Sequence, residues 1–388
     1  MKRIRACFLA MLLLAAPAVL AQFTYTTNNG AITITGYRGP GSVVTIPSAT
    51  NGLPVTGIGD FAFTFYAVTS VAIPNSVTNI GAYAFYDCTS LEAITVDAHN
   101  PDYSSLNGLL FNKGQTALVL YPVGAGNASY TIPNSVSDIG ANAFYGCSGL
   151  TNVIIPNTVI NIEANAFDLC SGLTSITIPN SVTSLGDYAF DECTSLASAA
   201  IGSGVTSIGY SAFFGTSLTI VAIPANVMSI GDYAFGYCRS LTNVTIPAGV
   251  GSIGGYAFEY CTSLTGVYFQ GNAPVADSTA FLFATGTVYY LPGTLGWGFN
   301  FAGLQTAPWA LPFPLILSSS LSFGLPTNPF AFTISWATNA AVVVEACTNL
   351  VNARWQPLQT NTLAGGSAYF SDAQWTNYAS RFYRISLP

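Results

Sequence analysis

IPNSVTSLGDYAFDECTSL, residues 178–196, is one copy of a phrase that recurs along most of the chain. The proline of this phrase recurs in steps of 22 or 23 residues, at Pro133, Pro156, Pro179, Pro224 and Pro247, with Gly202 in its place once. The phenylalanine keeps the same spacing, at Phe144, Phe167, Phe190, Phe213, Phe235, Phe258 and Phe281. A period in the low twenties predicts a solenoid, in which each copy forms one coil and buries its apolar side chains only against neighbouring coils.

Each copy divides into three segments with different expected conformations. Residues 173–178 alternate in polarity and precede Pro179, which predicts a parallel strand that ends where proline cannot donate a ladder hydrogen bond. Leu173, Ile176 and Ile178 are expected to point inward. The next segment is extended and turns at Gly186. The Ala-Phe-x-x-Cys part is expected to form a short helical or 3-10 turn, because its Ala, Phe and Cys then fall on one side.

The first 21 residues have the composition of a secretory signal peptide. Lys2, Arg3 and Arg5 form a positive start, residues 7–20 are largely apolar, and small side chains follow, so we expect the mature chain to begin at Gln22. A retained membrane anchor is the alternative, but the apolar run is short for a bilayer span. The chain is therefore predicted to be secreted or held at the cell surface, with no transmembrane segment after signal cleavage.

The repeats, residues 58–265, are expected to have a cap at either end. Residues 22–57 contain alternating strand-like segments around a hairpin signal, which predicts a β-rich N-terminal cap. Residues 266–309 are aromatic and rich in Gly and Pro, which suits a C-terminal cap over the open end of the stack. Residues 310–388 contain short apolar strands separated by turns. They predict a C-terminal β-sandwich similar to fibronectin type III modules.

One interval breaks the period. The step from Pro74 to Pro133 is 59 residues, which exceeds two repeats by 13 residues. The additional residues lie at about 97–130, where two apolar runs flank a turn-like segment at residues 112–114. We expect a β-hairpin to replace the usual coil there.

The repeat positions resemble the bacterial leucine-rich repeats of the BspA-like, Treponema-type family, which has a 23-residue unit. The matching positions are the Ile-Pro, Ile-Gly, Ala-Phe, Cys and Leu of each copy, across roughly residues 45–285. The resemblance implies a secreted or surface-exposed solenoid that serves adhesion or molecular recognition. It implies no catalytic residues for this chain.

The composition excludes one class of partner. Charged residues make up 6% of the chain and hydrophobic residues 51%, but the apolar residues follow the repeat spacing instead of forming membrane-length runs. After removal of the signal peptide, six Lys or Arg remain against 16 Asp or Glu, a net charge of −10. Nucleic acid is therefore excluded as a partner, because its binding depends on neutralising phosphates.

Catalytic and metal-binding signals are weak. His99 is the only histidine, and without a nucleophile motif we interpret it as a loop residue. Acidic residues at repeat turns are interpreted as a solvated face, with a pair for glycoside hydrolysis as the alternative. These acids are Asp168, Asp187, Asp191, Glu192, Asp232 and Glu259. We predict a non-enzymatic protein without a metal or a cofactor.

Six cysteines share one repeat position: Cys88, Cys147, Cys170, Cys193, Cys238 and Cys261. Stacking would bring neighbours such as Cys147 and Cys170 within reach of a disulfide. We favour buried thiols that act as small apolar side chains, because Thr216 occupies the same position in one copy. Zinc ligation is disfavoured, since the chain lacks closely spaced Cys or His pairs.

Two surfaces are candidates for ligand binding. On the solvent side of the strands, Thr177, Thr245 and Tyr268 belong to columns of mostly small, uncharged side chains. Such a flat surface suits broad contact with a protein or glycan better than a small-molecule pocket. The second candidate is a tyrosine column just before the Ala-Phe pair: Tyr83, Tyr188, Tyr233 and Tyr256.

The tyrosine column has two interpretations. Exposed rings can stack on sugars or anchor a protein partner, whereas packed rings would form a second structural ladder. Our main hypothesis is a recognition or adhesion protein that binds protein partners through the repeat face. The alternative is a carbohydrate-binding surface protein that uses the tyrosine column.

Overall fold

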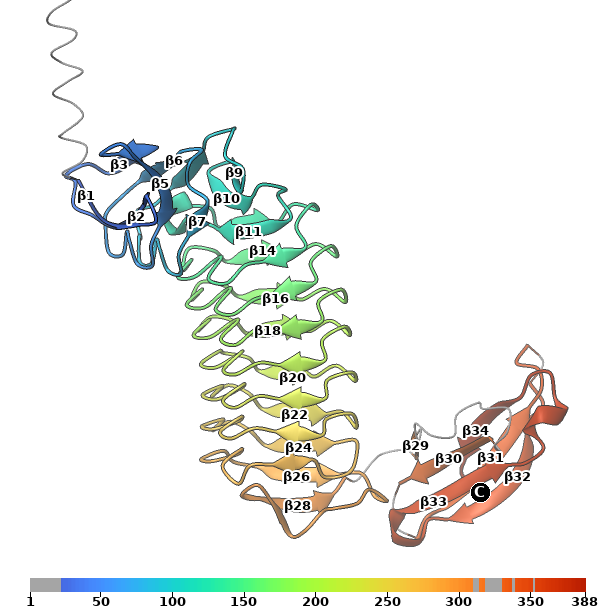
Figure 1. Ribbon diagram of the computed structural model, residues 1–388. Coiled ribbons are helices and arrows are strands. Elements are labelled where there is room, and N and C mark those ends of the chain that lie inside the picture. The colour runs from blue at the N-terminus through green and yellow to red at the C-terminus, as the bar shows by residue number, and fades with distance from the viewer. Residues whose placement is uncertain (1–21, 310–313, 318–329, 337–338, 352) are drawn as a thin grey trace, which may run out of the picture.

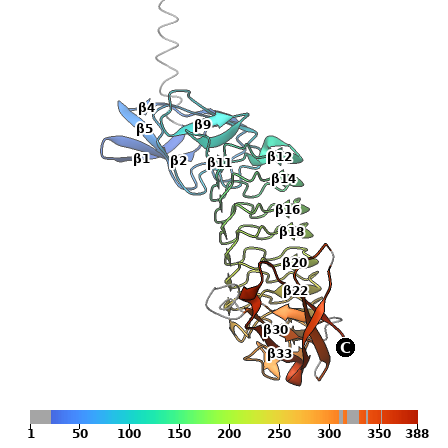
Figure 2. The same cartoon turned by 90° about the vertical axis from the view of Figure 1, so that its right-hand side faces the viewer.

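The computed structural model describes residues 22–388 except residues 310–313, 318–329, 337–338 and 352. The predicted signal peptide lies outside these described residues. The chain up to residue 309 forms an elongated stack of coils, and the C-terminal residues form a β-structure near the last coils (Figure 1). A view at 90° shows the coils following one another along a single axis (Figure 2). The predicted solenoid with parallel strands is confirmed.

One side of the stack carries a row of parallel strands, whose solvent side we call the strand face (Figure 1). The strands form a four-stranded and a six-stranded sheet, and the break between the sheets falls at the single 22-residue step. The first sheet contains β12 (Ser129–Thr131), β14 (Asn152–Ile154), β16 (Ser175–Thr177) and β18 (Ser198–Ala200). The second contains β20 (Ile220–Ala222), β22 (Asn243–Ile246), β24 (Gly266–Phe269), β26 (Thr287–Tyr290), β28 (Leu304–Pro308) and the antiparallel β27 (Asn300–Phe301).

A second parallel ladder follows another side of the stack. Its strands are two residues long, and each ends in an apolar residue that is buried or half-buried. Ile162, for example, pairs with Leu185 of the next coil. The strands are β13 (Asp138–Ile139), β15 (Asn161–Ile162), β17 (Ser184–Leu185), β19 (Ser207–Ile208), β21 (Ser229–Ile230), β23 (Ser252–Ile253) and β25 (Val275–Ala276).

The repeat phenylalanines form a continuous stack inside the coils. From Phe144 to Phe281 the ring centroids of neighbours are 4.7–5.4 Å apart, and the rings are within 10° of parallel. The backbone beside the rings is bonded from coil to coil, as the N–H of Phe167 donates to the C=O of Ala189 at 2.8 Å. The residues predicted to point inward are buried as expected, namely Leu173, Ile176 and Ile178.

The segment around each phenylalanine is a run of tight turns, which corrects the expected helical turn in detail. The hydrogen bonds do have 3-10 spacing, since Asp168 N–H donates to Asn165 C=O and Cys170 N–H to Phe167 C=O. However, Asn165 and Leu169 have φ values of 54° and 59°. These left-handed residues interrupt the helical path, so no helix forms around this phenylalanine.

Glycine permits the close approach of consecutive coils at the turn that follows the short strand. A Cβ atom at Gly209 would lie 2.8 Å from backbone atoms of Leu185 and Gly186. A Cβ atom at Gly186 would lie 2.5 Å from the carbonyl carbon of Glu163. The glycine of the repeated Ile-Gly or Leu-Gly pair is therefore required by the close spacing of the coils.

The N-terminal end of the stack is a β-rich unit. β1 (Phe23–Asn28) pairs antiparallel with β2 (Ala31–Tyr37), and Asn29 and Gly30 have the positive φ values of a tight hairpin turn. β2 pairs parallel with β5 (Leu53–Ile58), which also pairs with β4 (Ala49–Thr50) and β7 (Asn79–Ile80). A further parallel sheet contains β3 (Val43–Thr45), β6 (Ser70–Ile73) and β8 (Ala93–Val96).

The irregular interval forms an antiparallel unit within the stack. β9 (Tyr103–Leu106), β10 (Leu109–Asn112) and β11 (Ala117–Leu120) pair in order, and β11 joins the short-strand ladder through β13. The short 3-10 helix η1 (Val123–Ala125) follows. Tyr121 takes the place of the repeat phenylalanine, because its ring stacks on Phe144 at 5.2 Å and its N–H donates to the C=O of Ala143. The apolar interior divides into two clusters at this coil.

The C-terminal residues, which were predicted to form a β-sandwich, form two three-stranded antiparallel sheets. One sheet contains β29 (Leu315–Leu317), β30 (Phe330–Ser335) and β33 (Ser367–Asp372), and the other contains β32 (Gln356–Thr362), β31 (Ala341–Cys347) and β34 (Phe382–Ser386). Short 3-10 helices are η2 (Ala364–Gly366) and η3 (Trp375–Asn377). Phe332, Val344 and Phe370 belong to the shared core. Ser335 Oγ donates to the C=O of Pro292 at 2.6 Å, which joins this unit to the last coils.

The phenylalanine stack predicts a strong and local dependence of stability on each ring. We expect Phe190→Ala to lower the free energy of unfolding by about 3–5 kcal/mol, because it removes a fully buried ring from between two others. Urea unfolding and hydrogen exchange of the adjoining coils would measure this loss. Ile160→Ala, at a side chain that is 48% exposed, should change stability by less than about 0.5 kcal/mol. An equal loss of unfolding free energy in the two variants would contradict the conclusion that the phenylalanine stack stabilises the coils.

Candidate functional site

The strand face presents mainly small, uncharged side chains. Thr177 is exposed on β16 and Thr245 is half-exposed on β22, and both lie in the same column of the ladder. The most exposed apolar side chains of this face are Ile154 and Ile220, at 52% and 64%. The two threonines predicted for ligand contact therefore share one surface, but they belong to coils that are three repeats apart.

Tyr268 lies at the C-terminal end of the same face and is part of an aromatic group. Its ring stacks on Tyr289 at 5.1 Å and lies 4.9 Å from Trp309. All three side chains are half-buried. The repeat pattern identified Tyr268 but neither partner as a site residue, because Tyr289 and Trp309 lie beyond the last regular copy. Strand register is the signal that joins them, since Tyr268 pairs with Tyr289.

Three of the four predicted tyrosines lie in one row on the turn side, the surface formed by the Ala-Phe turns. The row, which we call the first aromatic row, is Tyr188, Tyr210, Tyr233 and Tyr256, with successive centroids 5.0, 5.6 and 4.8 Å apart. Tyr210 was missed from the sequence because Ser211 occupies the tyrosine position of that copy. The side chain one residue earlier fills the gap, so the row is continuous.

A second aromatic row runs beside the first. It consists of Phe214, Tyr237, Tyr260 and Phe283, with successive centroids 5.0, 4.7 and 4.7 Å apart. Phe214 also lies 6.3 Å from Tyr233, which connects the two rows. Phe283 was not predicted because it follows the last regular copy, and it is 57% exposed. The guanidinium of Arg239 lies 5.4 Å from the Tyr237 ring centroid, within cation–π range.

Tyr83, the fourth predicted tyrosine, belongs to a different group. Its ring stacks on Phe61 at 5.3 Å and packs edge-on against Tyr86 and Tyr145. Its hydroxyl accepts a hydrogen bond from Nδ2 of Asn165 at 3.1 Å. Asn142 and Asn165 occupy the column between Tyr83 and Tyr188, so the predicted column is not continuous.

Two of the acidic residues at repeat turns make structural contacts, which explain why they recur at the same repeat position. Asp187 Oδ1 accepts the N–H of Tyr210, and Asp232 Oδ1 accepts the N–H of Gly255, both at 2.8 Å. Each carboxylate thus satisfies a turn of the following coil. Asp168 and Asp191 are instead partly buried, and burial raises the pKa of each carboxyl to about 7. Asp191 has a buried Oδ1 without a hydrogen-bond partner.

His99 lies away from both aromatic rows and is an exposed loop residue. Its Nδ1 lies 3.2 Å from Oδ1 of Asp97, and its side chain is 87% exposed. Across the residues that the structure describes, we find no group of three or more His, Cys, Asp or Glu arranged to hold a metal ion. None of the helices in this part of the chain has the length and hydropathy to span a bilayer.

Comparison with known proteins identifies the family. The sequence model of the BspA type leucine rich repeat region matches six copies, over residues 44–113, 126–241 and 207–290, which is more than half of the chain. The chain belongs to the BspA-type leucine-rich-repeat family. No curated protein matches it in sequence.

The solved structures that resemble this chain include three leucine-rich repeat proteins from bacteria. A leucine-rich repeat protein from Eubacterium ventriosum is 23% identical, with a TM-score of 0.52, and the match covers 66% of this chain and 91% of the other. A leucine rich cell surface protein from Faecalibacterium prausnitzii is 29% identical, with a TM-score of 0.38, and 74% and 75% of the two chains are covered. The leucine rich repeat protein of T. pallidum is 24% identical, with a TM-score of 0.29 and coverage of 63% and 88%.

In this BspA-type protein, the cysteine of the repeat binds the backbone. Cys170 Sγ donates to the C=O of Phe144 at 3.0 Å, and Cys193 Sγ donates to the C=O of Phe167 at 3.1 Å. Thr216, at the same repeat position, differs from the cysteines because its Oγ1 donates to the C=O of Phe213 in its own coil, at 2.9 Å. All six repeat cysteines are buried free thiols, as predicted.

The thiols of this BspA-type protein should be unreactive in the folded state. Burial raises the pKa of Cys88 and of Cys238 to about 12, and raises that of Cys147 further. We therefore expect negligible reaction with Ellman's reagent at pH 8 in buffer, and complete reaction in 6 M guanidinium. Rapid labelling of the folded chain, located to repeat cysteines by mass spectrometry, would contradict this expectation.

The raised carboxyl pKa values give the stability a defined pH dependence. Between about pH 4 and pH 7 the folded chain holds protons on Asp168 and Asp191 that the unfolded chain releases, so stability falls as the pH rises. We expect Asp168→Asn or Asp191→Asn to raise the melting temperature at pH 7.5 by about 2–4 °C, and much less at pH 4. Both carboxyls retain contact with solvent, which limits the effect.

Scanning calorimetry at the two pH values would measure these shifts. Asp102→Asn changes an exposed loop residue and serves as the control, with no expected shift at either pH. A lower melting temperature of Asp191→Asn at pH 7.5 would show that the buried carboxylate contributes favourably to the fold.

Proposed function

We propose that this BspA-type protein is exported and acts as a non-enzymatic recognition protein, which binds a protein partner through the strand face outside the cell or at its surface. The positively charged start and apolar run of residues 1–21 support export. The observation that supports this proposal most directly is the form of the strand face, whose outward side chains on β12, β14, β16, β18 and β20 are exposed and mostly small and uncharged.

The chemistry of this face favours a protein partner. Its columns are mostly Ser, Thr, Ala and Asn, so little charge has to be removed from water when another surface covers them. Ile154 and Ile220 add exposed apolar area between these polar groups. Tyr268, Tyr289 and Trp309 place aromatic area at one end, and aromatic side chains are the usual energetic centres of protein interfaces.

The aromatic rows favour a second candidate function, which is binding of an extended glycan. Tyr188 and Tyr210 are 37% and 36% exposed, and Phe283 is 57% exposed. Successive rings lie about 5 Å apart, so the rows offer a long surface for stacking against sugar rings. However, the rings also pack against one another from coil to coil, and that packing explains the rows without a ligand.

Binding assays with surface variants separate the two functions. The purified chain would be applied to an array of purified extracellular proteins and to a glycan array. Thr177→Arg with Thr245→Arg adds charge and bulk to the strand face, and we expect at least a tenfold loss of affinity for a protein partner. Thr183→Arg, on an exposed residue next to the short-strand ladder, is the matched control and should retain affinity.

The outcome for the turn side is independent of the strand face. Loss of glycan binding in Tyr188→Ala with Tyr233→Ala, and unchanged binding in the threonine variant, would assign the function to the first aromatic row. A protein partner whose affinity survives the threonine variant would refute the strand face as the binding surface. Turnover of an arrayed glycan by the purified chain would refute the non-enzymatic assignment.

A further inference from the structure

An open groove of about 470 Å³ lies on the outer surface of the turn side, toward the N-terminal end of the stack. Five aromatic residues and one acidic residue form most of its wall: Phe61, Phe65, Tyr83, Tyr86, Tyr145 and Asp168. None of the residues that line the groove belongs to the strand face or to the two aromatic rows. The groove is thus a separate feature of the molecule.

The short turn of the irregular coil brings aromatic side chains of its neighbours together. Leu118 is aligned with Ile139, and Tyr121 takes the position of Phe144. Two residues separate Leu118 from Tyr121, whereas four separate Ile139 from Phe144. No residue of this short turn lines the groove, and rings of the coils on either side contact each other there.

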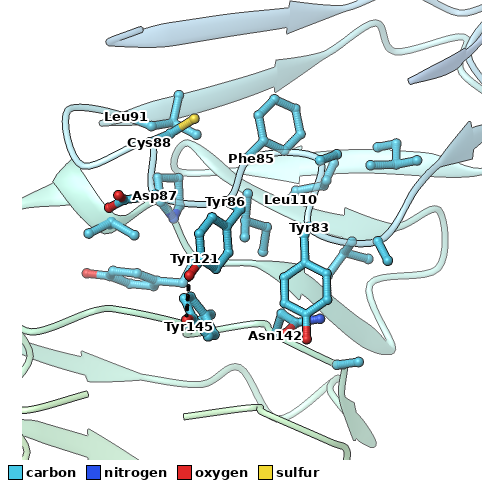
Figure 3. A pocket seen from close by; sticks show the side chains of 18 of the residues that line it. Tyr83, Phe85, Tyr86, Asp87, Cys88, Leu91, Leu110, Tyr121, Asn142 and Tyr145 are labelled. Atoms are coloured by element: carbon cyan, nitrogen blue, oxygen red, sulfur yellow. Dashed lines mark hydrogen bonds between the residues drawn. The ribbon is translucent and has the colours of Figure 1, made fainter. Parts of the chain in front are cut away.

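The rings form walls in different orientations. Tyr86 and Tyr145 have ring centroids 5.0 Å apart, and their hydroxyls form a 3.1 Å hydrogen bond (Figure 3). Tyr83 meets Tyr145 at 90°, and Phe65 meets Tyr86 at 89°. Phe61 stacks on Tyr83, but Phe61 and Phe65 are still 53% and 72% exposed. The groove therefore keeps free aromatic surface for an occupant.

Asp168 lies beside these rings without a counter-charge. None of the ion pairs between described residues includes it, and no Lys, Arg or His lines the groove. Burial raises the pKa of its carboxyl to about 7, and the charges of Asp191 and Glu192 on the next coil add to this rise. Burial and then the charge of Asp168 raise the pKa of Tyr83. The folded chain thus holds a partly desolvated carboxylate next to aromatic rings, at a cost in stability that no described cation offsets.

We propose that the groove binds an organic cation with a quaternary ammonium group, which rests against the rings and pairs with Asp168. Aromatic rings attract such a weakly hydrated cation. A neutral ligand would leave the carboxylate without a counter-charge, and an anion would be repelled by it.

Other cations fit the groove less well. A calcium ion needs six or more oxygen ligands, whereas Asp168 is the one carboxylate in this wall. A primary ammonium has three N–H donors, which aromatic rings cannot satisfy as carbonyl oxygens would. A quaternary ammonium has no N–H group, so the rings and one carboxylate meet all of its requirements.

Tetramethylammonium and tert-butanol, a neutral molecule of similar shape, test the class of ligand by isothermal titration calorimetry on the purified chain at pH 8. We expect tetramethylammonium to bind with a Kd of about 1 mM. The alcohol should bind at least about fivefold more weakly, because it lacks the charge. Methylammonium should also bind at least about fivefold more weakly, because its N–H groups would lose water without gaining enough acceptors.

Phe65→Ala and Phe283→Ala form a matched pair that tests the location. Both phenylalanines lie two residues after a buried repeat phenylalanine, and their φ values are 64° and 58°. Each change therefore removes an exposed ring at the same kind of backbone position. Phe65 lines the groove, whereas Phe283 belongs to the second aromatic row. We expect Phe65→Ala to weaken tetramethylammonium binding at least about threefold, and Phe283→Ala to leave it unchanged.

Asp168→Asn tests the charge. We expect this variant to bind tetramethylammonium at least about fivefold more weakly than the unmodified chain, and no more tightly than it binds tert-butanol. Asp102→Asn, in the exposed loop, is the matched control and should keep the affinity of the unmodified chain. The melting temperature of each variant shows whether the fold is intact.

The pH dependence of binding identifies the carboxyl. Asp168 takes up a proton as the pH falls through about 7, so affinity should fall at least about threefold from pH 8 to pH 5.5. The groups near this carboxyl are Asp191 and Glu192 on the next coil and the hydroxyls of Tyr83 and Tyr145. Asp191→Asn should keep the dependence and move its midpoint to lower pH, because the charge of Asp191 raises the pKa of Asp168. Asp168→Asn should remove the dependence.

Several results would overturn the proposal. No binding of tetramethylammonium up to about 20 mM, or equal affinity for tert-butanol, would show that the groove does not select a cation. Unchanged affinity in both Phe65→Ala and Asp168→Asn would place the site elsewhere. Tighter binding of a lysine-containing peptide than of tetramethylammonium would replace the quaternary ammonium with a protein side chain. None of these variants alters the strand face, so the outcome is independent of the proposed protein interface.

Discussion

The backbone hydrogen bonds between successive coils are the constraint on which the structure depends. They recur once per repeat at the same place, as from Phe167 N–H to Ala189 C=O at 2.8 Å. These bonds hold successive coils about as far apart as neighbouring strands of a sheet, so each side chain lies over its counterpart in the next copy. Flat rings can stack at this spacing without a gap, and a thiol can reach the carbonyl of the previous coil. The repeat signature is the set of side chains that tolerate this geometry.

The same constraint produces order on the outside of the molecule. Aromatic residues in consecutive copies become rows, and small residues become a flat face, whether or not a ligand uses them. Regularity alone is therefore weak evidence for binding. The strand face is the stronger candidate because its small side chains from β12 to β20 are exposed and are not stacked on one another as the rings are. The rings of the two aromatic rows already bury part of their surface against their neighbours.

The irregular coil after β11 brings together side chains that no regular copy of the repeat combines. The turn after β11 is two residues shorter than the turn of the following coil, which leaves space on the turn side between the neighbouring coils. Tyr86 and Tyr145 bridge the gap. The short turn of this coil thus leaves a partly open pocket beside the interior.

The sequence by itself determined the solenoid, the inward residues Leu173, Ile176 and Ile178, the buried cysteines and the solvent-facing threonines Thr177 and Thr245. These follow from period and polarity, because every copy makes the same contacts with its neighbours and the pattern is repeated many times. Only the tertiary structure decided the features that depend on unlike residues meeting across coils. Tyr210 fills the gap that Ser211 leaves in the first aromatic row, and Tyr289 and Trp309 pack against Tyr268. Tyr83 lies outside that row, where it packs against Tyr86 and Tyr145. Their contacts depend on how an irregular turn or a terminal coil packs, and no periodic pattern encodes that packing.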